Sequence, residues 1–194
     1  MKDSDGAAIE RTLAGDGDGF RVLVERYSRL VFRLAYRMTG NESDADDVVQ
    51  ETFLRAYRNL ATYDSRASFS TWLYRIASNY TLDLLAARKR RQQTFRPLEQ
   101  DPSDPDAPRR EAPSRDAGPD RLLLSREIQT RVAEALEELT PQERAAFSLR
   151  HLEHLPVEEI GAALQLNSNA TRNSIFRAVQ KLRRNLADFA GVTT

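Results

Sequence analysis

The chain has 194 residues, of which 40% are hydrophobic, and this is enough apolar material for one ordinary domain or two small ones. Lys and Arg together number 29, as do Asp and Glu, so the formal net charge is zero and any basic surface for nucleic acid must be local. The chain contains no cysteine, which excludes disulfides, thiolate catalysis and cysteine-ligated zinc.

Helical periodicity fills the first block, residues 1–91. Apolar residues recur every three or four positions over residues 20–38, and Gly40 then ends the run. A second helix is expected over residues 43–60, because its first residues, Ser-Asp-Ala-Asp, form a start like a capping box. A third is expected over residues 68–91. We therefore expect three helices in this block.

A segment with the composition of a linker, residues 92–120, separates this block from the next. Six of the eight prolines fall within residues 92–120, among Asp, Arg and Ser, namely Pro97, Pro102, Pro105, Pro108, Pro113 and Pro119. Such a composition cannot form a packed core, so we expect an extended, acidic tether.

The second block, residues 121–194, is again helical. One helix is expected to end at Leu139. Thr140-Pro141-Gln142-Glu143 then combines a capping box with proline at the first helical position, which marks the next helix, ending near His151. A short helix through Leu164, a tight turn and a last helix to about Ala190 follow. No strand pattern competes, so we expect an all-α fold of two small helical domains joined by a flexible linker.

The last two helices have the spacing of a helix-turn-helix, in which a short helix and a turn precede a helix with basic residues. Arg172, Asn173, Phe176 and Arg177 lie opposite the apolar stripe of the last helix, where they can reach base edges and phosphates, and Lys181 can contact the DNA backbone. The alternative is a pair of ordinary amphipathic helices with a solvated outer face.

The third helix of the first block has a second candidate surface. Trp72, Arg75 and Asn79 share one face, and the helix ends in four consecutive cations, Arg88, Lys89, Arg90 and Arg91. Aromatic and amide side chains beside cations suit single-stranded nucleic acid. Cations at a helix C-terminus also simply favour the helix dipole, and Trp72 fits a core position as well as a stacking platform.

Other chemistry is not expected. Asp16-Gly17-Asp18-Gly19 lacks the bidentate Glu of a calcium loop, so it is interpreted as helix capping. His151 and His154 have no third ligand, so no metal site is predicted. With no paired nucleophile and base, we expect neither an enzyme nor a cofactor. No apolar run reaches the roughly 18 residues of a membrane span, and the first ten residues are not a secretory signal, so a cytoplasmic protein without membrane insertion is expected.

Two stretches of the first block and three of the second resemble one known family. Asp46-Asp47-Val48-Val49-Gln50-Glu51-Thr52-Phe53, followed by Phe69-Ser70-Thr71-Trp72-Leu73-Tyr74-Arg75-Ile76-Ala77-Ser78-Asn79, is similar to region 2 of the sigma-70 family. Leu139-Thr140-Pro141-Gln142-Glu143-Arg144, Glu158-Glu159-Ile160-Gly161 and Ile175-Phe176-Arg177-Ala178 then resemble region 4, in the expected order. The chain thus resembles an extracytoplasmic-function (ECF) sigma factor with regions 2 and 4 only.

The resemblance implies a transcription initiation factor that directs core RNA polymerase to promoters and helps to melt the −10 element. Core polymerase would be bound through its β′ clamp helices and its β flap, and the residues matching the β′-docking surface are Asp46, Asp47, Gln50 and Glu51. The residues matched to −10 DNA are Tyr63, Arg66, Trp72, Arg75, Asn79, Arg88, Lys89, Arg90 and Arg91, with the loop from Tyr63 to Ser68 receiving a flipped base.

For region 4 the resemblance implies binding of the −35 element by Arg172, Asn173, Phe176, Arg177 and Lys181. The stretch from Asn169 to Ser174 departs from the usual pattern, so the −35 preference cannot be borrowed from relatives. An anti-sigma factor is a further implied partner, which no residue here identifies.

Two other hypotheses stay open at this point. A free-standing helix-turn-helix regulator would bind duplex operators as a dimer, without polymerase. A sigma mimic would only titrate an anti-sigma factor.

Overall fold

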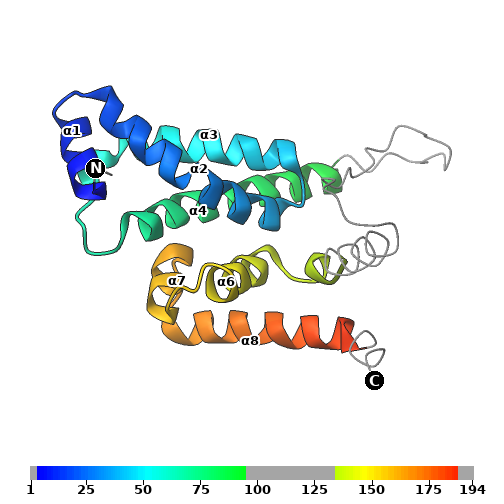
Figure 1. Ribbon diagram of the computed structural model, residues 1–194. Coiled ribbons are helices and arrows are strands. Elements are labelled where there is room, and N and C mark those ends of the chain that lie inside the picture. Colours follow the sequence, from blue (N-terminus) through cyan, green and yellow to red (C-terminus); the bar gives the residue numbers. More distant parts are fainter. Residues whose placement is uncertain (1–3, 95–133, 188–194) are drawn as a thin grey trace, which may run out of the picture.

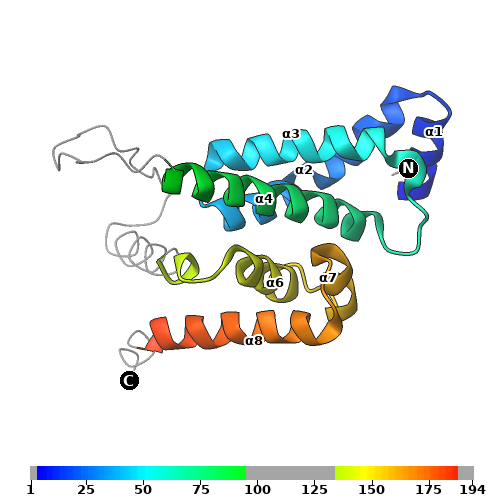
Figure 2. The same ribbon diagram turned by 180° about the vertical axis from the view of Figure 1, so that it is seen from behind.

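The computed structural model describes residues 4–94 and 134–187 of the chain. Every regular element in these two ranges is a helix, which confirms the all-α expectation. The elements are α1 (Asp5–Leu13), α2 (Gly17–Thr39), α3 (Glu42–Arg58), the short 3₁₀ helix η1 (Leu60–Thr62), α4 (Phe69–Thr94), α6 (Pro141–His151), α7 (Val157–Leu164) and α8 (Ser168–Asn185). Figures 1 and 2 show α2, α3 and α4 above, α6 and α7 beneath α4, and α8 outermost.

The three helices expected in the first block are present as α2, α3 and α4. Gly40 ends α2 as predicted, because it adopts a left-handed conformation with φ 67° and donates its N–H to the carbonyl of Tyr36. The predicted cap of α3 is wrong by two residues: Asn41, rather than Ser43, accepts the N–H of Asp44, at 2.8 Å. Since Gly40 already ends α2, Asn41 is free to take the extended conformation that an N-cap requires.

A fourth helix of the first block, α1, is not predicted from the sequence. Ser4 caps it, and its buried residues are Ala8, Ile9 and Thr12. Gly19 lets α2 pack closely against α1, because a Cβ at this position would lie only 2.6 Å from the carbonyl oxygen of Ala8. Asp16 caps α2 by accepting the N–H of Asp18 at 2.9 Å, so the capping interpretation of this segment is confirmed. Three buried residues in nine give too little periodicity to predict a helix.

The second block has the predicted order of helices α6, α7 and α8. Thr140 and Glu143 form the expected capping box, with distances of 3.2 Å from the Glu143 N–H to Thr140 Oγ1 and 3.0 Å from the Thr140 N–H to Glu143 Oε2. α7 and α8 form the helix-turn-helix. Gly161 permits its tight turn, because a Cβ there would lie 2.9 Å from the carbonyl oxygen of Leu166.

Parts of three expected segments lie outside the described ranges. The expected linker, 92–120, begins within the last turn of α4, which extends to Thr94, and the rest of it is not described. Of the helix expected to end at Leu139, residues 134–137 are described as helical. The last helix is described as α8 up to Asn185, and its predicted end lies beyond the described residues.

The two blocks pack against each other, with α2 and α4 of the first in contact with α6 and α7 of the second. Their buried apolar residues form one continuous cluster, which includes Leu73 of α4 and Leu149, Leu155 and Ile160 of the second block. A smaller cluster, in which Ala135 and Leu139 meet Ala178 and Leu182, fixes α8. The packing of one block on the other is not predicted from the sequence.

None of the described helices is both long and apolar enough to cross a bilayer. Within residues 4–94 and 134–187, no three acidic or histidine side chains are grouped so that they could hold a metal ion.

Candidate nucleic-acid interfaces

A cavity of about 390 Å³ opens where the loop after η1 meets the beginning of α4. We call it the loop cavity. The end of η1, the loop, the first turns of α4 and one residue of α7 supply its lining residues, Thr62, Tyr63, Asp64, Arg66, Ala67, Thr71, Trp72, Arg75 and Ala162. The structure thus brings together four residues predicted to bind −10 DNA: Tyr63, Arg66, Trp72 and Arg75.

An aromatic cluster shapes the inner wall of the loop cavity. The ring centroids of Tyr63 and Trp72 are 5.4 Å apart, and those of Phe69 and Trp72 are 5.6 Å apart. The Tyr63 hydroxyl donates a hydrogen bond of 2.8 Å to the carbonyl of Ala67, which fixes the loop, and burial raises the pKa of Tyr63. Trp72 is only 7% exposed. It therefore belongs to the core, while its remaining surface lines the cavity.

Polar contacts hold the loop in a fixed conformation at the mouth of the cavity. Ser68 accepts the N–H of Thr71 at 3.1 Å and thereby caps the start of α4. Asp64 and Arg66 form an exposed ion pair, and the hydrogen bond from the Arg66 side chain lowers the pKa of the Asp64 carboxyl. Ser65, between them, has a φ of 59°, a left-handed conformation that turns the chain sharply.

The other predicted −10 residues lie farther along α4. Asn79 is half-buried and does not line the loop cavity, since it lies about 10 Å along the axis from Trp72 at the rise of an α-helix. Arg88, about 24 Å from Trp72 by the same measure, forms a 2.9 Å ion pair with Asp44 of α3. The exposed run from Arg88 to Arg91 is therefore a separate cationic end of the first block.

The predicted polymerase-docking residues lie on α3. Asp46, Asp47 and Gln50 are exposed, whereas Glu51 is half-buried and accepts a 2.6 Å hydrogen bond from Nε of Arg55. The opposite side of α3 is buried against its neighbours through Val48, Thr52, Phe53 and Ala56. Helix α3 itself lies on the side of α4 away from the second block (Figure 1).

The predicted −35 residues lie on α8, the helix farthest from the first block. Arg172, Asn173, Phe176 and Arg177 are all exposed, and Phe176, at 60%, is unusually exposed for a large apolar side chain. Asn167 caps the helix by accepting the N–H of Ala170 at 2.8 Å. An aromatic ring and cations on one open helix face can meet a DNA groove.

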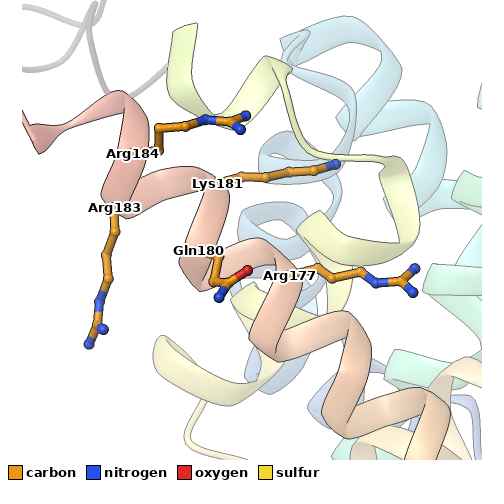
Figure 3. Close-up of a pocket in the computed structure, with 5 residues that line it drawn as sticks. All are labelled: Arg177, Gln180, Lys181, Arg183 and Arg184. Atoms are coloured by element: carbon orange, nitrogen blue, oxygen red, sulfur yellow. The ribbon is translucent and has the colours of Figure 1, made fainter.

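Lys181 differs from the other predicted −35 residues. Figure 3 shows that Lys181, Arg177 and Arg184 extend to one side of α8 and Arg183 to another; with Gln180, these residues line a groove of about 550 Å³. The ammonium of Lys181 is 2.7 Å from Oε2 of Glu143, so its charge is already paired within the second block.

Two contributions of α7 at the loop cavity, from Ala162 and Glu159, are not predicted from the sequence. Ala162 of α7 forms part of its lining, and Thr71 donates its hydroxyl to the carboxylate of Glu159, also on α7. The sequence separation of 88 residues between Thr71 and Glu159 leaves no local pattern to read.

Comparison with known proteins yields matches to both blocks. The family model of sigma-70 region 2 matches residues 23–91, and that of sigma-70 region 4 matches residues 129–182. The chain is 31% identical to the ECF RNA polymerase sigma factor SigW of Bacillus subtilis over 180 residues, which cover 93% of this chain and 95% of that protein. It is 36% identical to the ECF RNA polymerase sigma factor SigE of Mycolicibacterium smegmatis over 171 residues, 88% of this chain but only 63% of that longer relative.

Solved structures share the arrangement of helices. CnrH, solved in complex with the cytosolic domain of CnrY, is 26% identical, with a TM-score of 0.65 and coverage of 96% of this chain and 99% of that one. The sigma factor RpoE of Bartonella quintana, solved with the anti-sigma factor NepR, has a TM-score of 0.68 over 87% of this chain and 96% of that one. At 17% identity, the second likeness is one of fold alone.

Proposed function

The chain belongs to the ECF sigma factors of the sigma-70 family, and on that basis we propose that it directs core RNA polymerase to specific promoters and helps to open their −10 element. The observation that carries this proposal is the match of regions 2 and 4, in this order, together with separate exposed surfaces for each partner. The polymerisation chemistry would belong to the polymerase, so this chain acts as an initiation factor and not as an enzyme. We place it in the cytoplasm, with its polymerase.

The first block, residues 1–91, is proposed as the domain that docks on polymerase and opens the −10 element. Exposed Asp46, Asp47 and Gln50, with Glu51 beside them, give α3 an acidic face for the β′ clamp helices. Such a surface steers a basic partner and sets the register of docking more than it adds affinity.

The loop cavity is proposed to receive a base flipped from the non-template strand. Its aromatic wall, formed by Tyr63 and Trp72, and the cation of Arg75 at its edge supply the stacking and charge that single strands require. Unstacking a base costs a few kcal/mol, which binding in such a site offsets. Asn79 and the cationic run from Arg88 to Arg91 would follow the rest of the strand along α4.

The second block, residues 121–194, is proposed to bind the −35 element through α8. Arg172, Asn173, Phe176 and Arg177 form the open face that would enter the major groove. Lys181 is expected to contribute less, since its ammonium is held by Glu143. This block would also contact the β flap, and the residues between the blocks, 92–120, would serve as a tether. An anti-sigma factor is proposed as a regulatory partner, as NepR is for RpoE.

Run-off transcription with purified core polymerase tests the proposal. The DNA templates carry the promoters of genes whose transcripts increase when the chain is overproduced. Addition of the chain should yield promoter-dependent transcripts, and Asn79→Ala should impair promoter opening, measured by permanganate reactivity, more than affinity for core polymerase. Arg21→Ala, at an exposed position of α2 that belongs to none of these surfaces, is the control.

The absence of any promoter-dependent transcript, with normal polymerase binding, would favour a sigma mimic. Tight, sequence-specific duplex binding by the chain without polymerase would favour a free-standing regulator.

A further inference from the structure

The N-terminal helix α1 contacts the part of the first block that forms the loop cavity. It packs on α2 and touches η1, the element from which the loop begins. Figures 1 and 2 both show α1 at the end of the block where the loop leads into α4. The family model of region 2 matches only from residue 23 onward, so this match assigns no role to α1.

One carboxylate of α1, that of Asp5, binds two side chains of α2. Tyr27 donates its hydroxyl to Oδ2 of Asp5, and Nη1 of Arg26 pairs with Oδ1. The side chains of Asp5 and Arg26 are 32% and 30% exposed, so this contact is half-buried. Hydrogen bonds to an ionised acceptor are shorter and stronger than those between neutral groups. Asp5 therefore holds the Tyr27 ring in one position.

The Tyr27 ring is the first of four aromatic rings that lead from α1 to the loop cavity. Its centroid lies 5.5 Å from that of Phe69, the first residue of α4. The Phe69 centroid in turn lies 5.5 Å from that of Tyr63 and 5.6 Å from that of Trp72, and Phe69 is only 2% exposed. We call these four residues the aromatic row. Ring pairs at such distances have preferred orientations, so a displacement of Tyr27 would be passed on to the cavity wall.

Two further observations join α1 to this wall. Burial is the main cause of the raised pKa of Tyr63, and the negative charge of Asp5 raises it further, which places this carboxylate near the Tyr63 ring. α1 also packs on α2 without spare room at Gly19. A Cβ at Gly19 would lie 2.6 Å from the carbonyl oxygen of Ala8 and 2.8 Å from Oγ1 of Thr12. The distance between α1 and the aromatic row is therefore fixed by close packing.

We propose that α1 is part of the −10 site: Asp5 fixes Tyr27 and, through the aromatic row, the wall of the loop cavity, and α1 thereby decides which base the cavity accepts. Asp5 and Tyr27 are positioning residues, since neither lines the cavity itself. A wall that is already fixed before the base enters loses less conformational entropy on binding. The inference rests on the proposed function for the identity of the ligand, whereas the link between α1 and the rings does not.

The link between α1 and the cavity wall is tested through Trp72, the only tryptophan of the chain. Asp5→Ala removes the carboxylate, and Gly19→Ala displaces α1 without changing any charge or any member of the aromatic row. Both should shift the Trp72 emission to longer wavelength and increase its quenching by acrylamide. Glu10→Ala, at an exposed position of α1, and Gly17→Ala, where a Cβ meets nothing within 4 Å, should leave the emission unchanged.

Base selection is tested with core polymerase and a promoter fragment whose −10 non-template strand is single-stranded. Replacing one base at a time by an abasic site identifies the position that occupies the cavity. With the parent chain, affinity should fall about tenfold at that position, as expected for one stacked base. Asp5→Ala and Gly19→Ala should bring this ratio close to one, with unchanged affinity for polymerase alone. Tyr27→Phe, which keeps the ring but loses the bond to Asp5, should reduce the ratio less.

The ratio of affinities for the intact and the abasic fragment separates positioning from stability. A variant that is merely less stable would bind both fragments less well, in equal proportion, and the ratio would stay that of the parent chain. Far-ultraviolet circular dichroism and urea unfolding check that each variant is folded under the assay conditions. Asp5→Asn, which keeps the size of the side chain, replaces Asp5→Ala if that variant does not fold.

Two results would overturn the proposal. One is that Trp72 remains as shielded in Asp5→Ala and Gly19→Ala as in the control variants. The other is an undiminished abasic loss in these variants after fluorescence has shown that the rings have moved. A parent chain without abasic loss at any position would overturn the capture of a base, and base selection by α1 with it. Fluorescence alone reports the link, so its failure is distinct from a failure of the proposed function.

Discussion

Nζ of Lys181, near the C-terminal end of α8, lies 2.7 Å from Oε2 of Glu143, in the capping box of α6. The same carboxylate also accepts the N–H of Thr140, so one side chain both caps α6 and anchors α8 to it. This contact holds the cation of Lys181 on its own domain, whereas Arg177 and Arg184, which extend to the same side of α8, remain exposed.

The pKa of Glu143 predicts how the second block responds to acid. Burial raises this pKa, but the hydrogen bonds from Lys181 and Thr140 lower it more, so it lies below the ordinary value of 4.5. A depressed pKa stabilises the fold above the pKa of the unfolded state, and this stability is lost as pH falls through the folded-state value. Glu143→Gln should therefore destabilise the chain near pH 7, and the difference from the parent should shrink below about pH 4.5. Urea unfolding near pH 7 and below pH 4.5 measures this. A difference in unfolding free energy between parent and variant that stays constant with pH would contradict the prediction.

Tyr27 should make the first block sensitive to alkali. Its hydroxyl donates to Asp5 of α1, and burial together with this hydrogen bond raises the pKa of Tyr27 to about 12. With a raised pKa, the contribution to stability is complete below pH 10 and is lost as pH rises toward 12. Tyr27→Phe should cost about 1.5 to 3 kcal/mol at pH 7, because it removes a hydrogen bond to a charged group. Its unfolding free energy should then fall less than that of the parent between pH 10 and 12.

Gly161 is predicted to be irreplaceable in the helix-turn-helix. A Cβ there would lie 2.9 Å from the carbonyl oxygen of Leu166 and 3.2 Å from Oγ1 of Thr171, so the turn into α8 would have to move. Gly161→Ala should cost about 1 to 3 kcal/mol of unfolding free energy, as expected for overpacking. Gly17→Ala is the matched control, since a Cβ at Gly17 meets nothing within 4 Å. Equal effects of both changes would show that the turn relaxes freely.

Arg172 is predicted to affect DNA binding without affecting the fold. It is exposed on α8, so Arg172→Ala should change the unfolding free energy by less than about 0.5 kcal/mol. If Arg172 contacts a phosphate, Arg172→Ala should decrease the affinity of the polymerase complex for all sequences alike. The slope of log affinity against log salt concentration should also become smaller by about one. If Arg172 instead contacts a base, the loss should be confined to promoters with the preferred −35 element. An unchanged affinity on every promoter would remove Arg172 from the interface.

Local patterns in the sequence were sufficient to predict most helices. The capping box of Thr140 and Glu143, the stop at Gly40 and the apolar periodicity act over three or four residues, and the structure confirms them. The cap of α3 was misplaced because Asn41 and Ser43 are both good caps, and only the left-handed Gly40 decides between them. The sequence also predicted the exposed face of α8, because its apolar stripe fixes which side is buried.

Short-range spacing and motifs thus predict α2, α3, α4, α6, α7, α8, the helix-turn-helix and the family, but not α1. How the two blocks meet depends instead on long-range packing. Glu153 and Arg37 are 116 residues apart, and their pairing depends on the shapes of four helices rather than on any local pattern. For the same reason, no sequence signal shows that Ala162 lines the loop cavity or that Lys181 is held by Glu143. Long-range packing brings these groups together from distant parts of the chain, and a local pattern carries no information about it.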